Sequence, residues 1–352
     1  MGTPRKQTKS EHYTPGNAGA ISSKTKPGRL LAYNASFDTD DFLTHTMYTI
    51  EPNQDYRDQS LRQHQALSTE ELKADATQHY DECYRDYLFA WCNRDNLALH
   101  YGYWDDNRPY NQHQALLNKN QVLYTKAGIQ VSDKVLDAGC GIGGSSIWMA
   151  KQHGNQVTGI TISAKQADYA RQHARRHGVA ERVDFQVADF CETPFADASF
   201  DVVWALESSC HALNKGDFLR EAFRVLKPGG RVVVCDGFLL QRQFTEHQWQ
   251  AVVTCLNGWA VPNLCSRDEM QGLFAQQGFA DIQCHDITAQ TQASVEHMYK
   301  VAKRLQPVQK ISQWLGLRTK AQTANYLVGL AQYQLFNEKL TEYLIFTGQK
   351  PA

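Results

Sequence analysis

The feature that most constrains this chain is a short apolar segment that runs directly into a cluster of glycines. Val135-Leu136-Asp137-Ala138 is followed by Gly139-Cys140-Gly141-Ile142-Gly143-Gly144. The apolar segment predicts a buried strand, and the glycines predict a tight turn into a helix. Glycine lets a ligand approach the backbone closely, and the start of a helix offers free N–H groups. The pattern therefore predicts an α/β domain that binds a cofactor at this turn.

Strand and helix patterns alternate on both sides of this turn. Short apolar runs predict the strands 134–138, 156–160, 183–187, 200–206 and 231–235. Periodic apolar residues predict the helices 113–128, 163–178, 215–226, 245–258 and 266–277. Strands that alternate with helices predict a mainly parallel sheet with helices on both faces.

Two further strands are predicted near the C-terminus, at 279–288 and 342–348. The long segment between them contains Met298, Trp314 and Tyr326. Long insertions near strand ends often form lids over active sites, so we expect a helical lid here. Simple extra packing is the alternative.

Composition excludes several classes of protein. The 352 residues carry 36 Lys and Arg against 37 Asp and Glu, which argues against a general nucleic-acid-binding protein. The sequence has no apolar run long enough for a membrane-spanning helix. Its nine cysteines form no CxxC pair, which predicts reduced thiols in a cytoplasmic protein and no metal site. Residues 1–30 have no apolar core of a secretory signal and are predicted to be a disordered tail; a basic arm that touches anionic lipid is the alternative.

An aromatic-rich helix is predicted upstream of the core. Ser68 and Glu71 form a capping-box pattern at its start. Apolar and aromatic residues then follow at three- and four-residue steps: Leu72, Ala76, Tyr80, Cys83, Tyr84, Tyr87 and Trp91. This face either packs in the core or lines a pocket.

The glycine-rich turn also fits GxGxxG, so a dinucleotide has to be weighed as the ligand. A dinucleotide site needs an acidic residue after the second strand, where this chain has Thr161. Asp137, two residues before the first glycine, would lie poorly beside a pyrophosphate but suits a ligand with a cationic amino group. A nicotinamide oxidoreductase is therefore disfavoured.

Four segments in order resemble the motifs of class I S-adenosylmethionine-dependent methyltransferases. They are Leu136–Gly144, Ala188-Asp189-Phe190, Phe200–Trp204 and Leu226–Gly230. The resemblance implies a Rossmann-like, seven-stranded methyltransferase sheet and S-adenosyl-L-methionine as cofactor. It also implies four parts of the chain: the tail at 1–30, an N-terminal helical extension that roofs the cofactor at 31–111, the cofactor-binding core at 112–240, and lid helices with the last strands at 241–352.

Three more segments are similar to one branch of these enzymes. Gly159-Ile160-Thr161-Ile162-Ser163, with Gln166 after it, looks like the second strand end in sterol C-methyltransferases, tocopherol methyltransferases and cyclopropane-fatty-acid synthases. Leu206–Ala212 is similar to a Glu-containing segment of the sterol enzymes, and Leu99–Asp105 resembles a His/aromatic segment that roofs the cofactor.

The resemblance and the position of these residues at strand ends predict the site. Catalytic roles fall to Glu207, as base or cation stabiliser, and to His211 and His100. The acceptor is expected to contact four aromatic residues: Tyr80, Tyr84, Tyr103 and Trp104. The cofactor is expected to contact Asp137, Gly139, Cys140, Gly141, Gly143, Thr161, Ile162, Gln166, Asp189, Phe190, Leu206 and Tyr101.

The expected function is methyl transfer to a small lipophilic acceptor. C-methylation of an isoprenoid or sterol-like alkene would leave a carbocation that aromatic faces and Glu207 stabilise. Three alternatives are open: methylation of a tocopherol- or quinol-type ring or hydroxyl, methylation or cyclopropanation of an unsaturated acyl chain, and a non-catalytic cofactor-binding module. An apolar acceptor would favour a protein that visits membranes transiently, through its lid helices.

Overall fold

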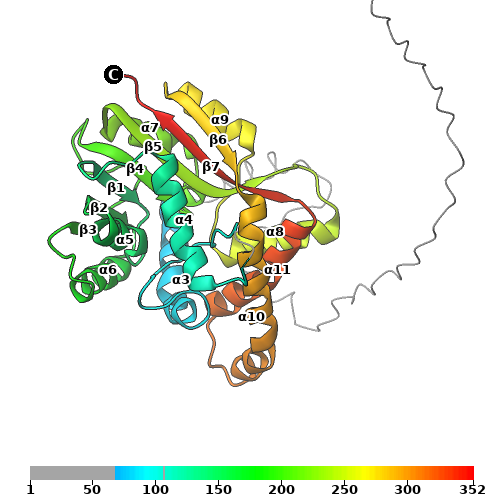
Figure 1. Ribbon diagram of the computed structural model, residues 1–352. Helices are drawn as coiled ribbons and strands as arrows, with labels where there is room; N and C mark the ends of the chain where they lie inside the picture. The colour runs from blue at the N-terminus through cyan, green and yellow to red at the C-terminus, as the bar shows by residue number, and fades with distance from the viewer. Residues whose placement is uncertain (1–67, 106–107) are drawn as a thin grey trace, which may run out of the picture. The chain divides into compact units, whose positions relative to one another are not determined.

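One seven-stranded sheet organises the chain in the computed structural model, which describes residues 68–105 and 108–352 (Figure 1). The strands lie in the order β3-β2-β1-β4-β5-β7-β6, and all neighbours are parallel except β7, which runs antiparallel to β5 and β6. The strands are β1 (Lys134–Ala138), β2 (Gln156–Thr161), β3 (Val183–Val187), β4 (Phe200–Leu206), β5 (Leu226–Leu239), β6 (Ala280–Asp286) and β7 (Thr341–Gln349). The predicted Rossmann-like sheet is confirmed.

The central strands are apolar on both faces because helices cover both faces. In β4, Val202 and Trp204 belong to one buried cluster, whereas Val203 and Ala205 belong to another on the opposite face. Side chains of a strand alternate between its faces, so a strand buried on both sides reads as a continuous apolar run.

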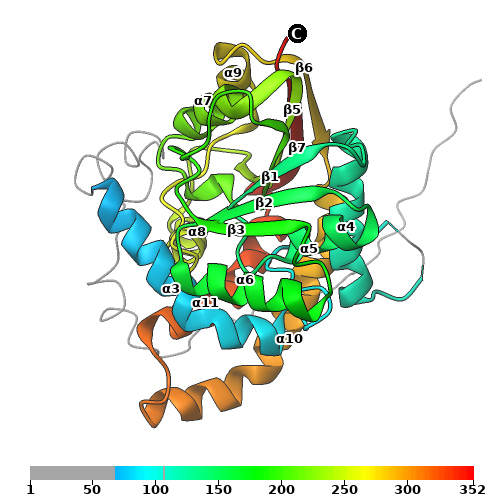
Figure 2. The same cartoon turned by 90° about the vertical axis from the view of Figure 1, so that its left-hand side faces the viewer.

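The helices flank the sheet and extend beyond its carboxyl edge (Figures 1 and 2). They are α3 (Thr69–Ala90), α4 (Gln112–Lys126), α5 (Gly144–Gln152), α6 (Ala164–Arg176), α7 (Lys215–Val225), α8 (Glu246–Gly258), α9 (Arg267–Gln276), α10 (Thr288–Trp314) and α11 (Lys320–Asn337), with a short 3-10 helix, η1 (Ser209–His211). The capping box at Ser68 forms as predicted, with the Ser68 hydroxyl accepting from the Glu71 backbone N–H. No described helix is long and apolar enough to cross a membrane.

Both predicted ends of the strand 231–235 are wrong, because β5 begins at Leu226 and ends at Leu239. Lys227–Gly230, predicted to lie between the helix 215–226 and this strand, belong to β5. Phe200 pairs with Leu226 and Val202 pairs with Arg231, so the intervening residues form an irregularity in the ladder. Gly229 takes a φ of +76° there, a conformation that glycine adopts without the steric cost of a side chain.

The segment between β6 and β7 is helical, as predicted, and consists of α10 and α11. α11 packs against α3, α8 and α10. These four helices therefore form one layer, here called the cover, built from segments far apart in the sequence. The proposed tail at 1–30 and residues 31–67 lie outside the described residues, and the four-part division of the chain stays a prediction.

Candidate active site

The glycine-rich turn after β1 is held tightly by two neighbouring segments. A Cβ added to Gly139, whose φ is +95°, would lie 2.4 Å from the Cβ of Ser208. A Cβ on Gly144 would lie 2.4 Å from the backbone oxygen of Leu97. The turn therefore fits between the segment after β4 and the segment that precedes α4, and only glycine allows both contacts.

A cavity of about 820 Å³, counted to its open mouth, lies over this turn. We call it the cofactor cavity. Nine of the twelve residues predicted to bind the cofactor line it: Asp137, Gly139, Cys140, Gly141, Thr161, Ile162, Gln166, Phe190 and Leu206. They come from β1, the turn, β2, the start of α6, the loop after β3 and the end of β4. The carboxyl edge of the sheet thus brings them together, as expected for parallel strands.

Asp137 is a buried carboxyl group in this cavity. Ser146, in the first turn of α5, donates a hydrogen bond of 2.6 Å to its Oδ2. Burial raises the pKa of Asp137 to about 6, because water is excluded from the charged form. A ligand with a positively charged amino group would supply the missing counter-charge, so the residue fits the amino-acid part of S-adenosylmethionine.

Polar groups elsewhere in the cavity are arranged to receive a ligand. Thr161 donates a hydrogen bond of 2.7 Å to the Oε1 of Gln166, which fixes the side-chain amide after β2. His100 is buried, and its Nδ1 lies 2.9 Å from the backbone oxygen of Tyr101. Its Nε2 has no hydrogen-bond partner among the described residues, although it is buried. Buried polar atoms are normally paired, so this atom is suited to a bound ligand.

Three predicted cofactor residues lie outside this cavity. Gly143 caps α5 and faces Phe185. Asp189 pairs with Lys73 of α3 at 2.6 Å, so its carboxylate links the loop after β3 to the cover. Tyr101 lines a second cavity. Contact of these three residues with the cofactor therefore stays a prediction.

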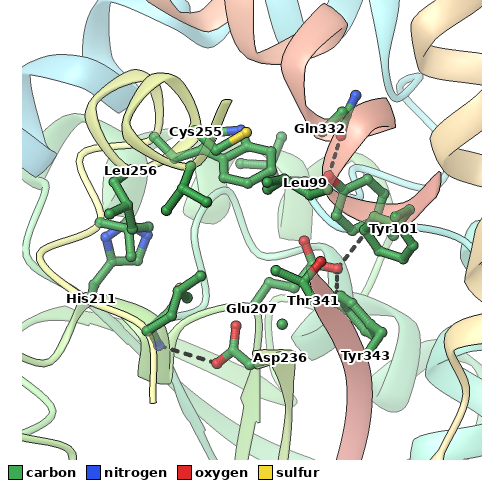
Figure 3. A pocket seen from close by; sticks show the side chains of 18 of the residues that line it. Leu99, Tyr101, Glu207, His211, Asp236, Cys255, Leu256, Gln332, Thr341 and Tyr343 are labelled. Carbon is green, nitrogen blue, oxygen red and sulfur yellow. Dashed lines mark hydrogen bonds between the residues drawn. The ribbon is translucent and has the colours of Figure 1, made fainter. Parts of the chain in front are cut away.

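The second cavity, the acceptor cavity, holds about 910 Å³ and lies between the sheet edge and the cover (Figure 3). Its wall is mainly aromatic and aliphatic. Among the described residues that line it there is no Lys or Arg. The main aromatic members are Tyr80, Tyr87, Trp91, Tyr101, Trp259, Phe336 and Tyr343. An apolar molecule without a phosphate group suits such a wall.

Four side chains line both cavities: Tyr80, Leu99, Glu207 and His211. A group that passes from a cofactor to an acceptor would cross between these four. Glu207 and His211 were predicted to be catalytic, and the structure brings them to this shared wall. His100, the third predicted catalytic residue, lines the cofactor cavity only.

Glu207 follows β4 in a strained backbone conformation. Its φ is +49°, which is unusual for a residue other than glycine. Its Oε1 accepts a hydrogen bond of 2.7 Å from the backbone N–H of Tyr101 and another from the hydroxyl of Tyr343. Burial raises the pKa of Glu207 to about 7, against the opposing influence of Lys119. Strained residues cluster at functional sites, which supports a role for Glu207.

His211 faces Glu207 from the other side of the acceptor cavity (Figure 3). Its Nδ1 lies 3.2 Å from the backbone oxygen of Ala260, and its Nε2 lies 2.9 Å from the hydroxyl of Tyr80. A carbonyl oxygen only accepts, so Nδ1 carries the proton and Nε2 is the acceptor. Burial lowers the pKa of His211 to about 4, so the ring is neutral near pH 7.

A buried lysine was missed by sequence reasoning. Lys119 of α4 has no exposed surface, and its Nζ lies 3.9 Å from the centre of the Tyr343 ring. Tyr343 in turn bonds Glu207, so these residues form one buried network from α4, β7 and β4. Burial lowers the pKa of Lys119, while the carboxyl group of Glu207 works in the opposite direction. A lone lysine in an amphipathic helix gives no signal of this position.

Asp236, also missed, is buried in β5 and lines the acceptor cavity. It accepts a bond of 3.1 Å from the backbone N–H of Cys210 and one of 2.5 Å from the Ser209 hydroxyl. Burial raises its pKa to about 6. The pattern of a carboxylate at the end of an apolar strand, Val232–Cys235, was a signal that could have found it.

Only one of the four predicted acceptor residues lines the acceptor cavity. Tyr80 does, but Tyr84 stacks on Tyr169 of α6 with 4.0 Å between ring centres. Trp104 packs edge-on against Tyr110, and Tyr103 hydrogen-bonds Ala115 through its backbone. Tyr84, Tyr103 and Trp104 do not line this cavity, so their contact with the acceptor stays a prediction. Tyr87 and Trp91, on the predicted aromatic face of α3, line it instead.

The fold and the paired cavities define a Rossmann-like protein with one cavity over its glycine-rich turn and a second, mainly apolar cavity beside it. Residues 136–234 match the family model described as a methyltransferase domain. The chain is 35% identical to the 27-O-demethylrifamycin SV methyltransferase of Amycolatopsis mediterranei over 72% of this chain and 90% of the relative. It is 30% identical to the chloroplastic tocopherol O-methyltransferase of Arabidopsis thaliana over 63% of this chain and 67% of the relative. The chain therefore belongs to the S-adenosylmethionine-dependent methyltransferases, and S-adenosylmethionine is its cofactor.

Solved structures support the same fold. The cyclase SpnF superposes with a TM-score of 0.65 at 23% identity, covering 78% of this chain and 95% of that chain. A geranyl diphosphate methyltransferase, crystallised with geranyl diphosphate and sinefungin, superposes with a TM-score of 0.62 at 20% identity, covering 79% and 99%. At these identities the likeness shows the shared fold and carries no inference about the acceptor.

Proposed function

We propose that this enzyme transfers a methyl group to a hydroxyl oxygen of a small, uncharged, lipophilic acceptor, with His211 as the general base. The observation that carries the proposal is the neutral imidazole in the wall shared by both cavities. Its Nε2 is held ready to accept a proton, because Nδ1–H is anchored on the carbonyl of Ala260. A general base needs this protonation state and this access.

The chemistry is a displacement at carbon. Bound S-adenosylmethionine would supply a methyl group on a positively charged sulfur, and the bond between this sulfur and the methyl carbon would break with its electron pair left on sulfur, which gives neutral S-adenosylhomocysteine. His211 takes the hydroxyl proton at Nε2 as the acceptor oxygen forms its bond to carbon, and the hydroxyl of Tyr80 gives up its bond to Nε2 to make room. Asp137 and His100 hold the cofactor, and the aromatic wall positions the acceptor and excludes water.

The relatives with broad coverage favour oxygen as the acceptor atom. The two relatives described above are named as a 27-O-demethylrifamycin SV methyltransferase and a tocopherol O-methyltransferase. A wall without Lys or Arg among its described residues argues against an acceptor that carries a diphosphate.

C-methylation is the second candidate, and one observation favours it. The carboxyl group of Glu207 lies in the shared wall opposite His211, among aromatic rings that would stabilise a carbocation. Glu207 as the carboxylate would then take the proton that regenerates an alkene. A sterol C-methyltransferase of Oryza sativa is 37% identical over 42% of this chain.

Isotope labelling tests both candidates. The enzyme is incubated with S-adenosylmethionine that carries a labelled methyl group and with lipid extract of the host, and labelled products are identified by mass spectrometry. We expect a methyl ether. A product methylated on carbon would overturn O-methylation, and cofactor binding without any labelled product would favour a non-catalytic module.

Substitution of the base tests the mechanism. His211→Ala should lower kcat by about 100- to 10,000-fold, the range for a lost general base, while the affinity for S-adenosylhomocysteine stays near that of the wild type. His173→Ala is the matched control, because burial also lowers the pKa of this histidine to about 4, but it lines neither cavity. Equal turnover in both variants would remove His211 from the chemistry.

A further inference from the structure

Exposed apolar side chains concentrate at one place on the described part of the molecule. Five large hydrophobic residues with more than half of their surface exposed lie within ten positions of the chain, and we call them the α10–α11 tip: Val308, Ile311, Trp314, Leu315 and Leu317. Trp314 is 83% exposed and Leu317 is 70% exposed. Single exposed hydrophobic residues are ordinary, but a cluster of this size marks a surface that contacts something apolar.

The helix geometry puts four of these side chains on one face, and Leu317 follows just after α10 ends. Val308, Ile311 and Leu315 follow one another at three- and four-residue steps, and Trp314 comes three residues after Ile311. They follow Pro307, which lies inside α10 and removes one backbone hydrogen bond. The turn between α10 and α11 lies far from the sheet in both views (Figures 1 and 2).

Positive charge surrounds this apolar face. Residues 300–320 contain no Asp or Glu. Five positively charged residues in this stretch are exposed: Lys300, Lys303, Arg304, Lys310 and Lys320. A sixth, Arg318, is largely buried and pairs with Asp86 of α3. An apolar helix face with a Trp and flanking lysines is the composition of segments that lie in the interface of anionic membranes.

A third cavity shares lining residues with both this surface and the acceptor cavity. It holds about 850 Å³ between α3, α10 and α11, and Val308, Ser312 and the exposed Phe89 belong to its lining. Four residues line both this cavity and the acceptor cavity: Tyr87, Trp91, Trp259 and Gln332. A lipophilic molecule that leaves a bilayer at the α10–α11 tip would therefore be close to the acceptor cavity.

We propose that the α10–α11 tip docks on the surface of an anionic lipid bilayer. Burial of the five apolar side chains and attraction of the lysines to lipid phosphates both favour this partner. A second copy of the chain fits less well, because a two-fold contact through the tip would place two basic segments against each other. The docking itself does not depend on which acceptor atom is methylated.

Sedimentation with vesicles tests the proposal on the full chain. The vesicles contain equal parts of phosphatidylglycerol and phosphatidylcholine, and vesicles of phosphatidylcholine alone serve for comparison. The wild type should bind the anionic vesicles, and added salt should weaken binding because it screens the lysines. Trp314→Ser combined with Leu317→Ser should lower the partition coefficient about tenfold or more, since two apolar anchors are lost.

Matched controls separate docking from general surface effects. Val131→Ser combined with Val187→Ser removes two exposed apolar residues elsewhere on the described surface and should bind vesicles like the wild type. Lys303→Gln with Lys320→Gln should weaken binding to anionic vesicles only. S-adenosylhomocysteine affinity, measured by calorimetry, should be unchanged in all variants, which shows an intact core.

Three results would overturn the docking proposal. They are a wild type that ignores anionic vesicles, tip variants that bind as well as the wild type, and a wild-type dimer in ultracentrifugation that the tip variants lose. None of them bears on methyl transfer, so failure of docking and failure of the proposed function are told apart.

Discussion

Glu207 combines three unusual properties in one residue. Its backbone is strained, its carboxyl group is held by Tyr101 and Tyr343, and its pKa is raised to about 7 by burial. In the ligand-free site, the carboxyl group of Glu207 therefore keeps its proton to a higher pH than a carboxyl group in water does. The folded protein bears the cost of this arrangement whenever the group ionises.

The stability of the ligand-free enzyme should reflect this cost. The pKa of Glu207 is raised from an ordinary 4.5 to about 7, so between these values the folded state keeps a proton that the unfolded state has lost. This retained proton contributes to the free energy of unfolding. The contribution is complete below pH 4.5 and is lost as the pH rises through 7. Glu207→Gln should therefore flatten the pH dependence between pH 5 and 8 and raise stability at pH 8 by on the order of 1–3 kcal/mol.

Urea unfolding at a series of pH values measures this effect. Glu221→Gln is the control of opposite sign, because Arg224 and Thr193 lower the pKa of Glu221. The ionised Glu221 stabilises the folded state at pH values above the ordinary pKa of a Glu, and this stabilisation is lost as the pH falls. Glu221→Gln should therefore be less stable than the wild type at pH 7. A Glu207→Gln variant with the slope of the wild type would contradict the raised pKa.

Asp137 carries the prediction for the cofactor. Asp137→Ala removes the buried carboxyl group that directly precedes the glycine-rich turn and should weaken S-adenosylmethionine binding about ten- to hundredfold, as expected for a lost charge-assisted bond. Because its pKa is about 6 in the ligand-free state, wild-type affinity should also fall below that pH. Calorimetric titration checks both. Asp168→Asn, an exposed carboxylate paired with Arg171, should bind like the wild type.

Which residues could be predicted from the sequence depends on where their partners lie. Asp137, Gly139 and Gly141 stand in one continuous segment whose local pattern defines their surroundings. The network of Lys119, Tyr343 and Glu207 joins three elements, and its members meet only through the packing of α4 on β7. No local pattern encodes such a meeting, so Lys119 and Tyr343 could not be predicted.

At the scale of elements, strands and helices were predicted to within one or two residues at most ends. Periodicity and caps are local properties, and α3 begins at its capping box as expected. β5 was the exception, since it pairs with β4 on both sides of Lys227–Gly230 and with β7 as far as Leu239. The cavity beneath α10 and α11 depends on how α3 crosses them, which periodicity does not specify.

The segment before α4 packs against the start of α5, and a substitution at Gly144 tests this contact. A side chain at Gly144 would collide with the backbone oxygen of Leu97, which cannot move aside without moving its segment. Gly144→Ala should therefore destabilise the protein by about 1–3 kcal/mol and weaken cofactor binding, because Leu97 and Gly144 both line the cofactor cavity. Thermal unfolding and calorimetric titration measure the two effects.

Gly272 offers the matched control within a helix. It lies exposed in α9, and a Cβ there would meet nothing within 4 Å. Gly272→Ala should raise stability by about 0.5–1 kcal/mol through the better helix propensity of alanine, without any change in cofactor affinity. Equal stability changes in the two variants would show that Leu97 does not restrain position 144.

At the scale of the whole molecule, the enzyme consists of a sheet, whose carboxyl edge lines the cofactor cavity, and a cover, which lines the acceptor cavity. The cover is built from segments that lie far apart in the sequence. One ion pair joins α3 to the segment between α10 and α11: Arg318 donates to both carboxylate oxygens of Asp86, at 2.8 and 2.5 Å. Both side chains are about four-fifths buried. A two-pronged contact of this kind is stronger than a single exposed ion pair.

Breaking this ion pair should loosen the cover more than the core. In a double-mutant cycle of Asp86→Asn and Arg318→Gln, each single variant leaves a largely buried charge without its ion-pair partner. The double variant should therefore lose less stability than the sum of the two single variants, with a coupling of about 1–3 kcal/mol. Hydrogen exchange should quicken in α3 and at the start of α11, while amides of β1 and β4 stay protected, because local opening follows the contacts that were lost. Uniform quickening across the sheet would mean that cover and core open as one unit, and the ion pair would then stabilise the whole fold.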